Sequence, residues 1–275
     1  LGLGGTSLAD RPLAAKIAGE VFNLNYIPLR EKDTLPDRPS MRRAMAASNG
    51  EIHLLRYCDA AGREVYARTA QFVIFLAIHR LWPNARARMD CAVGGGQFFA
   101  IFDCNNFSVR RLKAEIQNLV EMDIPLIRKR LTTQEAMAHF QSLGQEDKAR
   151  LLSWRKEDFF DVYTFEDYSN YFYGELAPST GYLQVWDIQQ KAGGFMFIYP
   201  DPKDPVLVAD YKESPHLFEM FSEGERWGYL MDCQTVADLN ELTDSGRIRE
   251  LIRVNEALHE KNYSRVADLV CQRGA

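Results

Sequence analysis

The stretch ARTAQFVIFLAIHRLWPNARARMDCAVGGGQFFAIF, residues 67–102, predicts a buried helix followed by a β-hairpin. Apolar side chains occupy most of the helical circumference over residues 67–81, which is typical of a helix buried on all sides. Trp82-Pro83-Asn84 then ends the helix. Residues 86–93 and 97–102 have the composition of strands, and Gly94-Gly95-Gly96 predicts the turn that joins them.

Helices and strands continue outward from this stretch. The helices expected, with Ser108 and Thr132 or Thr133 as N-caps, cover 41–47, 109–121, 133–143, 146–154, 216–230, 236–242 and 246–270. The strands expected cover one or two segments within 13–29, then 52–57, 126–131, 159–165, 182–188 and 195–199, with a loop at 33–40 and a turn at 59–62. This order, without an internal repeat, predicts an α+β fold with a helical C-terminal tail.

Composition excludes several classes of protein. The chain has 275 residues, a formal net charge of −5 and 46% hydrophobic residues, which describes an ordinary globular protein rather than a disordered one. An isoelectric point near 5.6 argues against a nucleic-acid-binding domain. The best apolar run, 72–78, is too short for a membrane span. Five cysteines without a C-x-x-C spacing indicate reduced thiols and a cytoplasmic location, and the first residues do not resemble a signal peptide.

The sequence contains none of the common catalytic or metal-binding signatures. It lacks a P-loop, a G-x-S-x-G elbow, an H-E-x-x-H pair and a zinc-type Cys/His arrangement. Gly94-Gly95-Gly96 could cradle an anion, but a hairpin turn is the favoured interpretation. Arg128-Lys129-Arg130 indicates a solvated strand edge. The aromatic residues of 163–173, followed by Pro178-Ser179-Thr180-Gly181-Tyr182, could stack a base or simply form core.

Residues 65–85 and the hairpin at 94–99 resemble the second additional domain of threonyl-tRNA synthetase. In that domain an H-x-x-x-H pair joins a later C-x-x-x-H pair at an editing site that deacylates mischarged tRNA. Alignment with those motifs puts Arg68 and Phe72, then Phe172 and Leu176, at the four positions. A family aspartate would be Asn170, and a family lysine is retained as Lys148. Phe and Leu can neither bind a metal nor transfer a proton, so the resemblance does not imply editing chemistry here.

A second resemblance covers residues 12–268. Certain bacterial uridine (nucleoside) kinases carry a synthetase-like N-terminal half ahead of a P-loop kinase domain. The matching motifs are Gly144-Gln145-Glu146-Asp147-Lys148, Phe172-Tyr173-Gly174, Pro178-Ser179-Thr180-Gly181-Tyr182-Leu183, Arg226-Trp227-Gly228, Asp238-Leu239-Asn240 and Glu256-Ala257-Leu258-His259-Glu260-Lys261. This resemblance implies a partial TGS-like segment at 1–60, an editing-domain-like α+β domain at 61–205, and a helical segment at 206–275 that leads into a kinase domain absent from this chain.

The expected function is therefore a non-catalytic recognition or regulatory part of an ATP-dependent uridine kinase. ATP and Mg²⁺ would belong to the parent kinase, and this chain, without a P-loop, is expected to be inactive alone, with no cofactor of its own. The alternatives are a free-standing tRNA-editing-like hydrolase and an RNA- or protein-binding module. The charge of −5 argues against RNA.

A nucleoside or nucleotide is the expected ligand, in a cleft between the 67–81 helix and the 159–183 segment. No catalytic or metal-binding residue is predicted. Arg68 and Lys148 would hold a phosphate or carboxylate, and Tyr173 would stack a base. Ser179 and Thr180 would bond hydroxyl groups, with Asn170 beside them. Each has a structural alternative, since Arg68 could pair with an acid and the Pro-Ser-Thr-Gly run could only form a turn.

Overall fold

The computed structural model describes residues 7–25, 44, 47–49 and 51–274. The chain forms two compact units. Unit 1 consists of Leu1–Leu131 and Phe160–Phe218, and unit 2 of Thr132–Phe159 and Glu219–Ala275. The segments 1–60, 61–205 and 206–275 stay predictions, and the helices inserted at 132–159 group with the C-terminal helices rather than with the middle segment.

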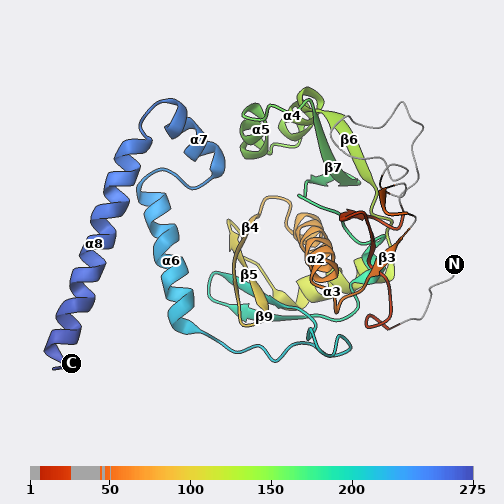
Figure 1. Cartoon of the computed structure of the whole chain (residues 1–275), viewed down its shortest axis with the longest axis horizontal. Coiled ribbons are helices and arrows are strands. Elements are labelled where there is room, and N and C mark those ends of the chain that lie inside the picture. The colour runs from red at the N-terminus through yellow and green to blue at the C-terminus, as the bar shows by residue number, and fades with distance from the viewer. Residues whose placement is uncertain (1–6, 26–43, 45–46, 50, 275) are drawn as a thin grey trace. The chain divides into compact units, whose positions relative to one another are not determined.

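The central element of unit 1 is helix α2, Ala60–Leu81 (Figure 1). Its buried residues lie on all sides, as the sequence predicts, and include Tyr66, Phe72 and Leu76. The helix begins earlier than the predicted residue 67, so the turn predicted at 59–62 is wrong. Gly62 lies inside the first helical turn, where a Cβ atom would stand 1.9 Å from the carbonyl oxygen of Arg56. Only glycine allows this close approach of the preceding chain.

A four-stranded antiparallel sheet packs beside α2 in the order β4-β5-β10-β9. Its strands are β4 (Arg86–Val93), β5 (Gly96–Phe102), β10 (Gly194–Ile198) and β9 (Asp187–Lys191). Gly94 and Gly95 form the predicted hairpin turn with positive φ angles of 61° and 84°. A Cβ atom on Gly94 would lie 2.5 Å from the carbonyl oxygen of Lys212, so this oxygen is close to the turn. Because a carbonyl oxygen carries partial negative charge, it disfavours an anion at the turn.

Two smaller sheets complete unit 1. The first has the order β2-β1-β3 and is antiparallel; its strands are β1 (Ala14–Ile17), β2 (Glu20–Phe22) and β3 (His53–Leu55). The second has the order β6-β7-β8; its strands are β6 (Arg128–Thr132), β7 (Phe159–Phe165) and β8 (Tyr168–Asn170). The loop predicted at 33–40 and most of the helix predicted at 41–47 lie outside the described residues.

The chain between β8 and β9 corrects one prediction. Of the strand expected at 182–188, only residues 187 and 188 are extended, at the start of β9, whereas Tyr182 ends a short 3₁₀ helix, η2 (Thr180–Tyr182). Asp123 explains the turn, because its Oδ1 accepts bonds from the Ser179 hydroxyl and the Gly181 backbone N–H. Asp123 follows helix α3 (Val109–Glu121), which begins at the predicted cap Ser108.

The core of unit 1 forms where α2, α3 and the four-stranded sheet meet. Phe99 stacks on Phe195 with ring centroids 5.2 Å apart, and Phe107 stacks on Phe195 at 5.7 Å. The opposite face of the sheet has a smaller buried cluster, against which Ala209 and Tyr211 pack. Both faces of the sheet are therefore covered, in agreement with the predominantly buried strand β10.

Unit 2 is helical. Its helices are α4 (Thr133–Ser142), α5 (Glu146–Ser153), most of α6 (Pro215–Leu230), α7 (Val236–Asp244) and α8 (Ile248–Gln272). Thr132 forms the predicted N-cap of α4 in a capping box with Glu135. The whole fold is thus α+β with a helical C-terminal segment, as predicted. In the part of the chain that the structure describes, no helix combines the length and apolarity that a membrane span requires.

Candidate functional site

The four positions aligned with the editing motifs all belong to unit 1, where Phe72 and Leu176 are buried core, Phe172 packs against that core and Arg68 keeps part of its side chain exposed. Phe72 on α2 and Leu176 have no exposed surface. The Phe72 ring lies 6.3 Å from that of Phe172 and 5.6 Å from that of Tyr168. No group of three or more His, Cys, Asp or Glu side chains could hold a metal ion within the described residues. Aromatic contacts therefore occupy the place where the motif would put metal ligands.

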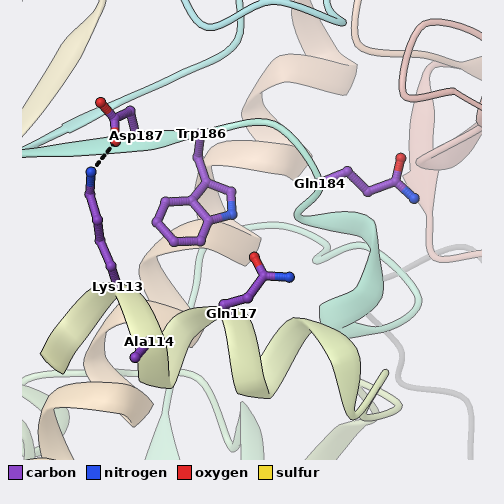
Figure 2. A pocket seen from close by; sticks show the side chains of 6 residues that line it. All are labelled: Lys113, Ala114, Gln117, Gln184, Trp186 and Asp187. Carbon is purple, nitrogen blue, oxygen red and sulfur yellow. Dashed lines mark hydrogen bonds and ion pairs between the residues drawn. The ribbon is translucent and has the colours of Figure 1, made fainter. Parts of the chain in front are cut away.

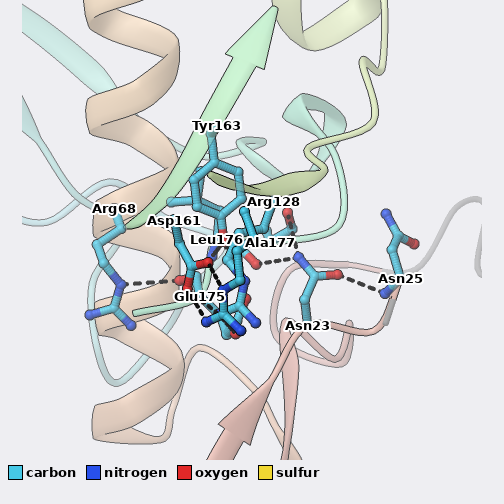
Figure 3. Close-up of polar contacts among 10 residues, drawn as sticks. Asn23, Asn25, Arg68, Arg128, Asp161, Tyr163, Glu175, Leu176 and Ala177 are labelled. Carbon is cyan, nitrogen blue, oxygen red and sulfur yellow. Dashed lines mark hydrogen bonds and ion pairs between the residues drawn. The ribbon is translucent and has the colours of Figure 1, made fainter. Parts of the chain in front are cut away.

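Side chains from helix α2 and from the chain after strand β2 hold the peptide segment 175–177 (Figure 3). The Arg68 guanidinium Nε donates to the carbonyl oxygen of Glu175 at 3.0 Å. The Asn23 amide donates to the carbonyl oxygen of Leu176 at 2.8 Å, and the Ala177 N–H donates to the Thr69 hydroxyl at 2.8 Å. These buried bonds fix the backbone, because each unpaired peptide group would carry a desolvation cost.

Glu175 places a carboxylate inside this region, with only 4% of the residue exposed. An Arg128 guanidinium nitrogen lies 2.7 Å from one of its oxygens, and the Tyr163 hydroxyl donates to the other at 3.2 Å. Burial, and then the charge of Glu175, raise the pKa of Tyr163 above its usual range, so the phenol keeps its proton. The carboxylate is thus both charge-paired and hydrogen-bonded.

The predicted ligand residue Arg68 reaches the backbone of Gly174, which follows a second predicted ligand residue, Tyr173, in the sequence. The Arg68 guanidinium lies against Gly174, where a Cβ atom would stand 2.8 Å from Cζ. One of its terminal nitrogens lies 3.5 Å from a carboxylate oxygen of Glu64, one helical turn away. Tyr173 is 74% exposed and contacts Tyr171 edge-on, with ring centroids 5.7 Å apart. The acid pairing expected as the structural alternative for Arg68 is present.

Asn170, Ser179 and Thr180 contribute hydrogen bonds to the fold. The Thr180 hydroxyl donates to the carbonyl oxygen of Leu119 at 2.6 Å and accepts from the Ile124 N–H at 2.9 Å. Thr180 has no exposed surface, so its predicted contact with a ligand is wrong in this structure. The Ser179 hydroxyl donates to Asp123, and the Asn170 amide donates to the Tyr168 hydroxyl at 2.9 Å.

Lys148 belongs to unit 2 and not to the unit that holds the other five residues. It lies on α5 with its ammonium 5.4 Å from the centre of the Phe140 ring. Burial lowers the pKa of Lys148 to about 8, and the neighbouring Asp147 charge opposes that shift only in part. The six predicted residues are therefore divided between two units.

The ion pairs of Arg128 and Arg130 were not predicted from the sequence. Arg128 and Arg130 were expected at a solvated edge, yet Arg128 contacts Glu175 and Arg130 makes two hydrogen bonds to Asp161, at 2.7 and 3.0 Å. Strand β6 does lie at a sheet edge, and both arginine side chains keep part of their surface exposed, but the ion pairs were not predicted. The run Glu175-Leu176-Ala177-Pro178 contains the signal from which the ion pair could have been predicted. A carboxylate among apolar residues needs a partner when it is buried.

Comparison with known proteins relates the chain to threonine–tRNA ligases, although no family model matches it. The ligase of Methylobacillus flagellatus is 23% identical over 195 residues, which is 70% of this chain and 28% of the ligase. The ligase of Desulforamulus reducens is 27% identical over 68% of this chain and 27% of the ligase. The ligase of a Janthinobacterium species is 26% identical over 81% of this chain and 34% of the ligase.

The chain thus spans about a quarter to a third of the length of the curated relatives it matches. The predicted resemblance to a region of threonyl-tRNA synthetase is confirmed, and the α+β architecture is consistent with an additional-domain-like fold. The resemblance to nucleoside kinases stays a prediction.

Proposed function

We propose that this chain is an editing-domain-like module that recognises a nucleoside or nucleotide without hydrolysing an ester. The observation that carries the proposal is that two of the four positions aligned with the editing motifs are buried apolar core. Phe72 and Leu176 are fully buried and carry no group that could activate water. The similarity to threonine–tRNA ligases supports the editing-domain origin.

The ligand would bind at the surface formed by Arg68 and Tyr173. The exposed Tyr173 ring offers a face on which a base can stack. The Arg68 guanidinium, held by the carbonyl oxygen of Glu175, is pre-oriented and keeps part of its side chain exposed. The base and the phosphate of a nucleotide need one partner each, and Tyr173 and Arg68, which lies against the neighbouring Gly174, would supply them. Lys148, in the other unit, is not required for this mode of binding.

Titration of the full chain with nucleosides, nucleotides and tRNA tests this proposal. Tyr173→Ala is expected to weaken nucleotide binding about tenfold or more, since stacking on an aromatic ring contributes roughly 1–3 kcal/mol. The matched control is Tyr229→Ala, because Tyr229 is similarly exposed at 71% and lies in unit 2. Equal binding by both variants would contradict the proposal.

Hydrolysis is measured in the same preparations. The wild-type chain is expected to deacylate mischarged aminoacyl-tRNA no faster than buffer alone. Turnover above that rate, lost in Lys148→Ala, would instead favour the hydrolase alternative with Lys148 as the recruited base. Turnover that persists in Lys148→Ala would still contradict the non-hydrolytic proposal.

The second candidate function is the predicted one, a part of a uridine kinase that is joined to a P-loop domain. The observation that favours it is helix α8, on which no residue is buried. Its exposed large apolar residues are Ile252, Val254, Tyr263, Val266, Leu269 and Val270. Apolar surface of this extent favours coverage by a further domain. ATP and Mg²⁺ would bind that domain, and the cytoplasmic location stays a prediction with it.

Sequencing the natural gene beyond the codon for Ala275 tests the second candidate. A G-x-x-x-x-G-K-[ST] motif shortly downstream, together with ATP-dependent phosphorylation of uridine by the whole product, is the expected result. A natural product without that motif would contradict the kinase function. The binding proposal above does not depend on this outcome.

A further inference from the structure

A second surface of unit 1, distinct from the Arg68–Tyr173 surface, forms a pocket of about 380 Å³ (Figure 2). Helix α3 provides one wall, and the chain entering strand β9 provides the other. The lining residues are Lys113, Ala114, Gln117, Gln184, Trp186 and Asp187. This volume lies within the range of small-molecule sites, which run from roughly 300 to 1,000 Å³.

Trp186 gives the pocket a fixed aromatic wall. Its indole N–H donates to the carbonyl oxygen of Leu183 at 3.1 Å. Its ring stacks on Phe197, with centroids 5.9 Å apart and an interplanar angle of 15°. The indole is therefore held before any ligand arrives, while part of its surface stays open to the pocket. A rigid aromatic ring binds planar ligands well because little conformational entropy is lost on stacking.

Two exposed glutamines line the pocket, and the Gln117 amide lies next to the indole while the Gln184 side chain extends away from it (Figure 2). The Gln117 amide donates to Glu121 at 2.9 Å, which leaves its carbonyl oxygen and a second N–H. Within the described residues, the Gln184 side-chain amide makes no hydrogen bond. An amide both donates and accepts, and this combination matches the polar edge of a nucleobase.

The charges in the pocket favour an uncharged ligand. Lys113 and Asp187 form an ion pair with each other, so the lining carries one charge of each sign. Both side chains are about 40% exposed, and a pair in that setting binds weakly enough to exchange partners with a ligand. A phosphate would have to compete with Asp187 for Lys113, whereas the hydroxyls of a sugar can bond to either group.

We propose that this pocket binds a nucleobase, with Trp186 as the stacking face and the Gln117 amide at the base edge, while Gln184 lines the pocket farther from the indole. The base could belong to a free nucleoside or to an unstacked position in an RNA strand, which present the same chemistry. This site is independent of the Arg68–Tyr173 surface, since the two share no residue.

Titration of the full chain with uridine, cytidine, adenosine, guanosine and an unstructured RNA oligonucleotide tests the inference, with saturation-transfer NMR as the readout. Trp186→Leu is expected to weaken binding about tenfold or more. Gln184→Ala is expected to weaken it about twofold to tenfold, and because that side chain is exposed the fold is preserved. The matched control is Trp154→Leu, since Trp154 is exposed and lies in unit 2.

Binding of free nucleosides that is lost in Trp186→Leu supports the inference and identifies a nucleoside as the ligand. Binding of the oligonucleotide alone, lost in the same variant, supports it with RNA as the source of the base. No saturable binding of any probe at millimolar concentration overturns it. Binding that survives Trp186→Leu and Gln184→Ala but is lost in Tyr173→Ala also overturns it, and supports the proposed function at Arg68 and Tyr173 instead.

Discussion

Replacing Arg128 by Met tests whether the buried ion pair in unit 1 stabilises the fold. The change leaves the Glu175 carboxylate, 5% exposed at its side chain, without the guanidinium that lies 2.7 Å away. Removing one partner of a buried pair costs about 3–5 kcal/mol. The Arg128 side chain is 21% exposed and water can replace part of its charge, so we expect the lower end of that range, about 3 kcal/mol.

The assay is urea unfolding followed by tryptophan fluorescence. A Trp154→Phe, Trp227→Phe background leaves Trp82 and Trp186, which both report on unit 1. The control variant is Arg86→Met, whose ion pair with Asp103 is 77% and 58% exposed and should cost at most about 0.5 kcal/mol.

A double variant distinguishes the cost of an unpaired Glu175 charge from the cost of the packing lost with the Arg128 side chain. Adding Glu175→Gln to Arg128→Met removes the unpaired charge but keeps an oxygen that can accept from Tyr163. The double variant is therefore expected to be more stable than Arg128→Met alone. An Arg128→Met variant that loses no more free energy of unfolding than Arg86→Met would contradict this expectation. A double variant less stable than Arg128→Met alone would contradict it as well.

Three further changes probe the fold. Asn23→Ala leaves the buried carbonyl oxygen of Leu176 without its amide donor and should cost about 1–3 kcal/mol in urea unfolding. Thr180→Val removes a hydroxyl that both donates and accepts and should cost a similar amount, about 1–3 kcal/mol by the same assay. Burial lowers the pKa of Lys148 to about 8 from 10.5, so between those values the unfolded chain binds more protons. The wild type should gain about 1–3 kcal/mol over Lys148→Met from pH 8 to pH 10.5, and a constant difference would contradict this.

The sequence predicts the elements whose signals are local. Helix α3 has an apolar face at helical spacing and a capping Ser108, and strand β7 is predicted with its observed bounds. The 3₁₀ helix η2 was not predicted, because the contacts that form it are not local in the sequence. Its turn depends on Asp123, which is 56 residues from Ser179 and 58 from Gly181, so no local pattern reveals it. Apolar residues at 182 and 183, buried by tertiary packing, then resemble a strand.

The candidate site was predicted less well than the fold, because its decisive contacts join distant segments. Arg128 and Glu175 are 47 residues apart, and Asn23 and Leu176 are 153 apart. Residue type alone identified both Tyr173 and Thr180 as ligand candidates, but it could not show that Tyr173 is exposed and Thr180 buried. A hydroxyl has the same chemistry in a fold and in a ligand site, and only its partners separate the two roles.

The loss of the editing motif is a property of the whole cluster and not of single positions. The rings of Phe72 and Phe172 contact each other and Tyr163, so a histidine restored at residue 72 alone would be buried among aromatic faces. An imidazole there would lack hydrogen-bond partners and would destabilise the fold instead of binding a metal. Under the proposed function, recognition by unit 1 uses groups beside this cluster, such as Arg68 and Tyr173, which keep exposed surface.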